Sequence, residues 1–182
     1  MMTGMTSNRR LAALALVAAL AATSAAALVQ SPQIAPPDAP SAGRLVSPGE
    51  PGTPLSVSGS VVSPDGAPVA GASIYAFQTD AEGYYGVKPE SDNRRPRLKV
   101  LLRSDARGAW AFETIRPGSY PGSRVPAHIH FEVSAEGFAP RIFEIVFEGD
   151  PFVTAEMRRN AAFSVRPVGA GGKVTERIVL TR

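Results

Sequence analysis

The two histidines of this chain lie two residues apart, in the segment Pro126-Ala127-His128-Ile129-His130-Phe131. In a β-strand, residues i and i+2 point to the same face about 7 Å apart, so both imidazoles can reach one metal ion. Imidazole is a frequent ligand in sites built from nitrogen and oxygen. The pair predicts a metal site, and the alternative is a hydrogen-bonded or solvated strand face.

Further ligands must come from oxygen, because the chain has no cysteine. This excludes disulfides, thiolate sites and cysteine nucleophiles. Glu132 shares the histidine face, but about 13 Å of strand separates it from His128, too far for both to bind one ion without a bulge.

Tyrosine is the better candidate for those ligands. Three of the four tyrosines, Tyr84, Tyr85 and Tyr120, lie near glycines at turn edges, whereas Tyr75 does not. A phenol has a pKa near 10, so a phenolate at neutral pH requires a strongly Lewis-acidic cation such as Fe(III). The alternative for each tyrosine is a ring packed at the edge of the fold with its hydroxyl in water.

The elements that must position these residues are short strands. Period-two alternation and intervening turn residues predict eight strands and no capped helix after the first segment, which favours an all-β sandwich. The predicted strands cover residues 55–62, 72–78, 99–103, 110–114, 128–133, 141–147, 162–168 and 174–181. The stretch of residues 85–98 is too long for a hairpin, and such loops are often functional.

The N-terminal part differs in composition from the rest. Residues 1–27 place Arg9 and Arg10 before an apolar run and a small-residue tract, the order of a secretory signal peptide, and that run is too short to span a bilayer. Residues 28–54 contain seven prolines and predict a Pro-rich linker. We therefore expect a signal peptide over residues 1–27, a linker over 28–54 and the sandwich over 55–182.

The expected location is exported, periplasmic or extracellular, and the arginine pair is also compatible with the twin-arginine route. The chain has 19 basic and 16 acidic residues. Removing Arg9 and Arg10 leaves 17 against 16, a net charge of +1. This balance indicates neither a nucleic-acid partner nor, after signal removal, a membrane partner.

Four segments in order resemble the intradiol ring-cleavage dioxygenases, the catechol and protocatechuate 3,4-dioxygenase family, and specifically a secreted minimal-domain type without a helical extension. The segments are SGSVVSPDGAPVAGASIYAFQTDAEGYY, RSDARGAWAFETIRPGSYP, VPAHIHFEV and FEIVFEGDP. The resemblance implies a β-sandwich with one non-haem Fe(III) held by Tyr85, Tyr120, His128 and His130. It also implies that Tyr120 leaves the metal and takes a proton while a catechol is cleaved with O2 to a muconate-type diacid.

Two positions depart from the family pattern. An arginine usually stands directly before PAHIH, whereas this chain has Val125 there and Arg124 one place earlier. A shift of one residue along a strand turns a side chain to the opposite face. A glutamine often stands where this chain has Glu144, an acid that could repel an anionic catecholate or hydrogen-bond a neutral one. We expect Arg124 to be the catalytic arginine if it reaches the pocket, and Val125 and Glu144 to contact substrate.

Two other functions remain open at this point. Parts of the chain also resemble transthyretin-like and carboxypeptidase-regulatory sandwiches, which are exported binding modules without chemistry. Such modules have no reason to place PAHIH after the PGSY turn. A periplasmic copper or zinc binder that uses His128 and His130 is the third reading, and the absence of further histidines and of Met clusters is adverse to it.

Overall fold

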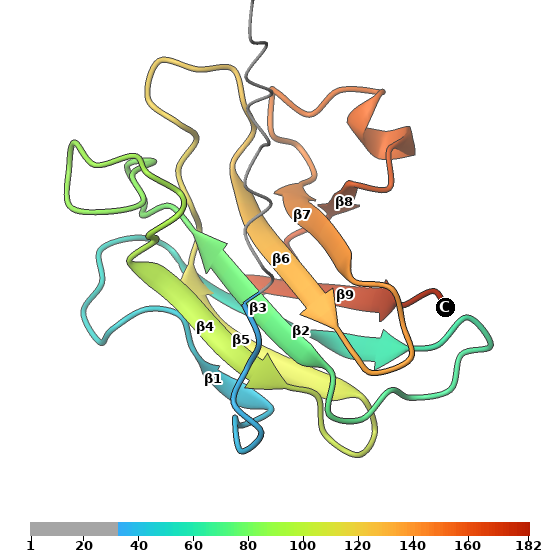
Figure 1. The fold of residues 1–182 in the computed structure, drawn as a ribbon. Coiled ribbons are helices and arrows are strands. Elements are labelled where there is room, and N and C mark those ends of the chain that lie inside the picture. The colour runs from blue at the N-terminus through green and yellow to red at the C-terminus, as the bar shows by residue number, and fades with distance from the viewer. Residues whose placement is uncertain (1–32) are drawn as a thin grey trace, which may run out of the picture. The chain divides into compact units, whose positions relative to one another are not determined.

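The computed structural model describes residues 33–182. This part of the chain contains nine β-strands and one short 3-10 helix, joined by loops (Figure 1). The elements are β1 (Ala42–Arg44), β2 (Pro54–Val62), β3 (Ser73–Gln78), β4 (Leu98–Arg103), β5 (Ala109–Ile115), β6 (His128–Ser134), β7 (Arg141–Phe147), η1 (Met157–Arg159), β8 (Phe163–Arg166) and β9 (Lys173–Val179). All eight predicted strands are present, so the prediction of an all-β fold is confirmed. In this part of the chain, no helix is long and apolar enough to cross a bilayer.

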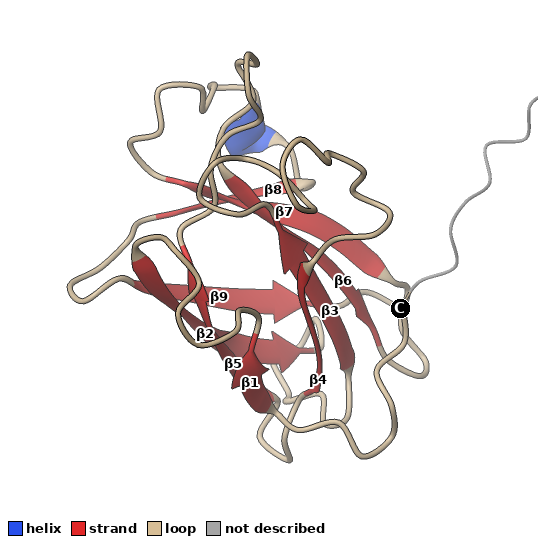
Figure 2. Ribbon diagram, turned by 90° about the vertical axis from the view of Figure 1, so that its left-hand side faces the viewer, coloured by secondary structure: helices blue, strands red, loops and turns tan. Residues whose placement is uncertain are grey.

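The strands form two mixed sheets that face one another (Figure 2). One sheet has the order β1-β5-β2-β9 and the other the order β4-β3-β6-β7-β8. β6 lies at the centre of the five-stranded sheet, antiparallel to both β3 and β7. A central strand is held on both sides by ladder hydrogen bonds, so it is a rigid base for a site.

Strand alternation gives β6 two different faces. Ile129, Phe131 and Val133 belong to the core between the sheets and are almost completely buried. Phe131 stacks on Phe143 of β7 with ring centroids 5.1 Å apart. Because side chains alternate along a strand, His128 and His130 lie on the outer face of the sheet.

Residues 33–54, the part of the predicted linker that the structure describes, pack on the sandwich. β1 pairs with β5 in parallel, and Leu45 is only 4% exposed in the core. Upstream, the amide of Ala35 donates to Ser73 Oγ at 2.8 Å, and Arg103 donates to the carbonyl oxygens of Ala35 and Pro36. Residues 33–54 therefore form an arm that packs on the sandwich.

The sequence pattern does not predict this packed arm, because its prolines remove hydrogen-bond donors and interrupt the hydrophobic period that is typical of strands. The sandwich begins before residue 55. The predicted signal peptide and the start of the predicted linker lie outside the described residues.

Candidate metal centre

The outer face of β6 is covered by two loops, one following β3 and one following β5. Both loops lie at the end of the sheet where β6 begins (Figure 1). The first supplies Tyr85, and the second supplies Tyr120. The start of β6 is fixed by Asp150, whose carboxylate accepts hydrogen bonds from the amides of Ala127 at 3.1 Å and Phe152 at 3.0 Å.

The four side chains predicted as ligands converge on one point. Tyr85 Oη lies 2.5 Å from Tyr120 Oη and 2.6 Å from His130 Nε2. Tyr120 Oη lies 2.9 Å from His128 Nε2, and the two Nε2 atoms are 3.1 Å apart. The four atoms thus form a closed ring of contacts on the outer face of the sheet.

The partners of the two Nδ1 atoms determine where the imidazole protons are. His128 Nδ1 lies 2.8 Å from the carbonyl oxygen of Pro126, which can only accept, so this nitrogen carries a proton. His130 Nδ1 lies 3.2 Å from Glu144 Oε1, a carboxylate that also accepts. In the neutral form of each ring, Nε2 then presents a lone pair to the centre.

When both imidazoles are neutral, the four contacts of this ring share only the two phenol protons. Each phenol has one proton and can donate it to one histidine, Tyr85 to His130 and Tyr120 to His128. The contact between the two Nε2 atoms and the contact between the two phenol oxygens are left without a proton. Lone pairs that face one another at 2.5 to 3.1 Å repel unless a cation lies between them.

The charges around the centre favour the same conclusion. Burial raises the pKa of Tyr85, with a further contribution from Tyr120, and burial also raises the pKa of Tyr120. Burial, and then the charge of His130, lower the pKa of His128. Without a cation, the two phenols and His128 are neutral, and the donor set of two phenols and two imidazoles fits a strongly Lewis-acidic ion.

Of the two candidate acids, Glu144 lies near the two histidines, whereas Glu132 is not part of this group. The ligand atoms of His128, His130 and Glu144 lie within 4.8 Å of one another. Glu144 is the direct cross-strand partner of His130. Burial raises the pKa of Glu144, but the hydrogen bond with His130 and the electrostatic interaction with the histidine pair together leave this pKa lowered.

The other side of His130 is apolar. Phe77 of β3 is the direct cross-strand partner of His130 on that side. Its ring stacks on the imidazole with ring centroids 4.4 Å apart. Tyr75, Phe77 and Tyr85 form a small hydrophobic cluster, against which Tyr120 packs. His130 is thus held between an aromatic ring and a carboxylate.

A cavity of about 430 Å³ opens on the two phenols. Its lining residues are Tyr84, Tyr85, Ser91, Asn93, Tyr120 and Pro121. Ser91 and Asn93 belong to the long loop of residues 85–98, which we singled out in the sequence. Tyr84 lines the cavity but is not part of the ring of contacts, and its aromatic ring lies 5.6 Å from Lys88 Nζ.

Two other predicted residues lie elsewhere. Arg124 is exposed, and its guanidinium lies over the ring of Phe152 at 5.6 Å. Val125 is 37% exposed. Neither lines the cavity, and neither does Glu144, which faces His130 instead. The structure therefore brings together the four predicted ligands but not Arg124 or Val125.

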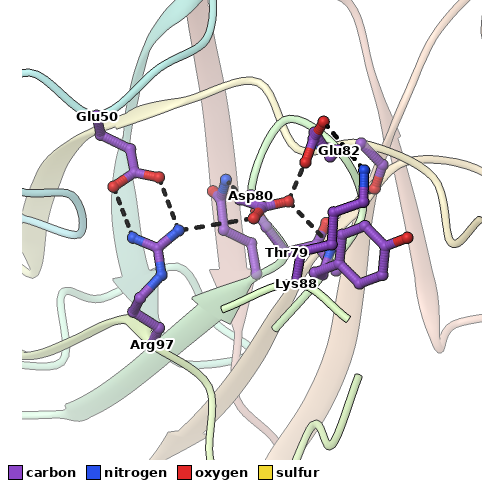
Figure 3. A network of polar contacts seen from close by, with 9 residues as sticks. Glu50, Thr79, Asp80, Glu82, Lys88 and Arg97 are labelled. Atoms are coloured by element: carbon purple, nitrogen blue, oxygen red, sulfur yellow. Dashed lines mark hydrogen bonds and ion pairs between the residues drawn. The ribbon is translucent and has the colours of Figure 1, made fainter. Parts of the chain in front are cut away.

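A polar network holds the first loop in place (Figure 3). Arg97 forms two hydrogen bonds with the carboxylate of Glu50, at 2.6 and 2.8 Å, and lies 3.6 Å from Asp80 Oδ2. Asp80 Oδ1 accepts the amides of Glu82 and Tyr84, both at 3.0 Å. The arm residue Glu50 is thereby connected to the turn that precedes Tyr85.

From the sequence, Glu144 was expected to contact substrate rather than His130, and Phe77 was not named as a residue of this centre. The contact of Glu144 with His130 depends on the register between β6 and β7, which the sequence does not show. Phe77 had a usable signal, because it lies in a predicted strand and alternates with the buried residues Ala76 and Gln78. The strand order was needed to place it beside His130.

The fold and these side chains define a β-sandwich with a candidate metal centre of two tyrosines and two histidines. A family model described as "Dioxygenase" matches residues 30–168. The chain belongs to the intradiol ring-cleavage dioxygenase family. The match begins well before residue 55, which agrees with the packed arm.

Relatives carry names of ring-cleaving enzymes. Chlorocatechol 1,2-dioxygenase of Pseudomonas sp. (strain P51) is 33% identical over 126 residues, which are 60% of this chain and 49% of the relative. Hydroxyquinol 1,2-dioxygenase of Rhizobium sp. (strain MTP-10005) is 30% identical over 131 residues, 63% of this chain and 43% of the relative. The chain thus spans less than half the length of these two relatives.

Solved structures show the same fold. The dioxygenase domain of a dioxygenase carbohydrate-binding protein fusion from Streptomyces sp. SirexAA-E has a TM-score of 0.59 and 27% identity. The likeness covers 82% of this chain and 93% of that one. Catechol 1,2-dioxygenase from Acinetobacter sp. ADP1 has a TM-score of 0.61 and 21% identity, over 79% of this chain and 59% of the other, which supports the fold alone.

Proposed function

We propose that this protein is a non-haem ferric dioxygenase that cleaves a catechol with O2 between its two hydroxyl-bearing carbons, giving a muconate-type diacid. The observation that carries the proposal is the closed ring of Tyr85, Tyr120, His128 and His130, in which each Oη or Nε2 atom lies 2.5 to 3.1 Å from the next. The names of the relatives, chlorocatechol and hydroxyquinol 1,2-dioxygenase, support a catechol-type substrate.

Both tyrosines and both histidines would hold one Fe(III). When bound, the ion supplies Lewis acidity that makes the phenols ionise at neutral pH and activates a bound catechol toward O2. Glu144 and the carbonyl oxygen of Pro126 hold the Nδ1 protons, which keeps each Nε2 lone pair directed at the centre.

The two tyrosines have different tasks. Tyr85 is 2% exposed and lines the cavity, so it is suited to remain in place. Tyr120 is half-buried, lines the same cavity and lies against His128. Because Tyr120 is closer to solvent, its oxygen, once ionised by a bound ferric ion, would be the one placed to accept a proton from a hydroxyl of the substrate.

The proposal is tested on the purified full chain loaded with ferric iron. We expect about one iron per chain and a wine-coloured protein, whose visible absorption band arises from phenolate-to-iron charge transfer. Adding catechol without oxygen should shift the band, and adding oxygen should consume O2 and give only the intradiol diacid. A colourless preparation that takes up no ferric iron would contradict the proposal and favour a binding module without chemistry.

We also propose that the protein is exported and that residues 1–27 are removed as a signal peptide. The supporting pattern is the arginine pair followed by an apolar run and small residues. N-terminal sequencing of the protein recovered from the cell envelope or the medium tests this. An N-terminus at Met1 in a cytoplasmic fraction would contradict it.

A further inference from the structure

We propose that the cavity selects neutral catechols that carry a hydrogen-bonding substituent, and disfavours catechols that carry a carboxylate. This inference rests on the proposed function and specifies its substrate class. None of the six lining residues carries a charge, and four of them are tyrosine or proline. A carboxylate that enters such a cavity loses water and finds no cation in the wall.

The cations of the cavity loop are already paired with acids or lie outside the wall. Arg94 Nε lies 2.9 Å from Asp92, and Lys88 lies 3.5 Å from Glu82. Arg97 is bound to Glu50 at 2.6 Å. Arg95, the fourth cation of residues 85–98, does not line the cavity. Turning one of the three paired cations toward a substrate would leave its acid without a partner.

The charged side chain next to His130 is an acid. Glu144 Oε1 lies 3.2 Å from His130 Nδ1, and the cross-strand register fixes it there. A second negative charge on the substrate ring would be repelled by this carboxylate through a partly buried site, where screening is weak. The electrostatics of the centre therefore act in the same direction as the uncharged wall.

The cavity also has room beyond an unsubstituted ring. Its volume of about 430 Å³ lies within the range of pockets that bury drug-sized molecules. Ser91 and Asn93 line it from the loop, and both are exposed. A serine hydroxyl and an asparagine amide can each donate and accept, so they can pair with a hydroxyl, ester or amide on the ring.

The test compares three ligands on the iron-loaded full chain without oxygen: catechol, 3,4-dihydroxybenzoate and its methyl ester. The dissociation constant of each is measured from the shift of the absorption band. We expect the ester to bind at least tenfold more tightly than the acid and more tightly than catechol. Equal or tighter binding of the acid would overturn the inference.

Two variants test the named residues. Replacing Ser91 and Asn93 together by alanine should abolish the advantage of the ester over catechol, measured as the ratio of their dissociation constants. Asn93→Arg should reduce the ratio between the dissociation constants of the acid and the ester at least threefold. Thr181→Arg, which adds the same charge at the exposed C-terminal end, is the matched control and should leave this ratio unchanged.

The outcomes separate this inference from the proposed function. If the protein takes up no iron, or if its band does not respond to any catechol, the proposed function fails and this inference fails with it. If catechol shifts the band but the acid is preferred, or if the alanine variant keeps the ester advantage, only the substrate class proposed here is wrong.

Discussion

The backbone amide of Arg97 donates to the carbonyl oxygen of Tyr85 at 2.7 Å, so the first and last parts of the cavity loop are joined directly. The guanidinium of the same arginine reaches Glu50 of the N-terminal arm and Asp80 of the turn before Tyr85. One residue therefore connects the arm, the turn and a tyrosine of the candidate metal centre. The position of that tyrosine depends on contacts made outside the centre.

Glu50→Gln should lower stability by a modest, pH-dependent amount. The hydrogen bonds from Arg97 lower the pKa of Glu50 in the folded chain, although partial burial opposes this. A lowered folded-state pKa means that the stabilisation is present above the ordinary pKa of 4.5 and is lost as the pH falls through the lowered value. Because Arg97 is 38% exposed, solvent screening limits the effect to about 1 kcal/mol or less.

The measurement is the free energy of unfolding in urea for both proteins between pH 7 and pH 3. The difference between them should be constant from pH 7 to about pH 5 and shrink below that. Glu136→Gln removes an exposed acid away from this network and is the matched control. A difference that grows toward acid pH would contradict the assignment.

Glu144→Ala should weaken iron binding roughly 10- to 100-fold, because the acceptor that orients His130 is lost. Glu144→Gln should retain most of the affinity, since its amide oxygen can still accept the Nδ1 proton. The measurement is iron retention against a graded series of chelator concentrations, which does not require turnover.

Glu132→Ala is the control for the alanine variant. Glu132 lies on the same strand, but its carboxylate accepts the amide of Gln33 at 3.2 Å. Its removal should leave iron affinity unchanged. Equal iron retention by Glu144→Ala and the unaltered protein would show that Glu144 does not position His130.

The contrast between Glu132 and Glu144 shows what the sequence could reveal. Strand periodicity was enough to place His128 and His130 on one face and to exclude Glu132 by distance along the strand. Tyr85 and Tyr120 could be assigned only through the resemblance, because loops of unknown path carry them. The contact of Glu144 with His130 follows from the pairing of β6 with β7, a long-range register that local patterns do not encode.

Tyr120→Phe should remove or strongly change the visible band of the iron-loaded protein. The variant lacks one phenol oxygen of the ring of contacts, while its aromatic ring can still pack against Tyr85 and His128. Tyr84→Phe is the matched control, because Tyr84 lines the cavity but takes no part in the ring of contacts. Absorption spectra at equal iron content check both. Loss of the band in Tyr84→Phe alone would mean that the neighbouring tyrosine is the ligand.

A chain that begins at Leu55 should be clearly less stable than one that begins at Gln33. The shorter chain lacks β1, which pairs with β5, and it lacks the buried side chains of Ala35 and Leu45. Burying a leucine contributes about 1.5 to 3 kcal/mol, so we expect a loss of about 2 kcal/mol or more in the free energy of unfolding.

The shorter chain also lacks Glu50, so Arg97 keeps only Asp80 as an acidic partner, and the cavity loop should loosen. We therefore expect weaker catechol binding in addition to lower stability. The chain that begins at Gln33 retains every contact described here and is the control. Equal unfolding free energies for the two chains would mean that the arm adds nothing to the sandwich, because an arm that packs against the core must stabilise it when bound.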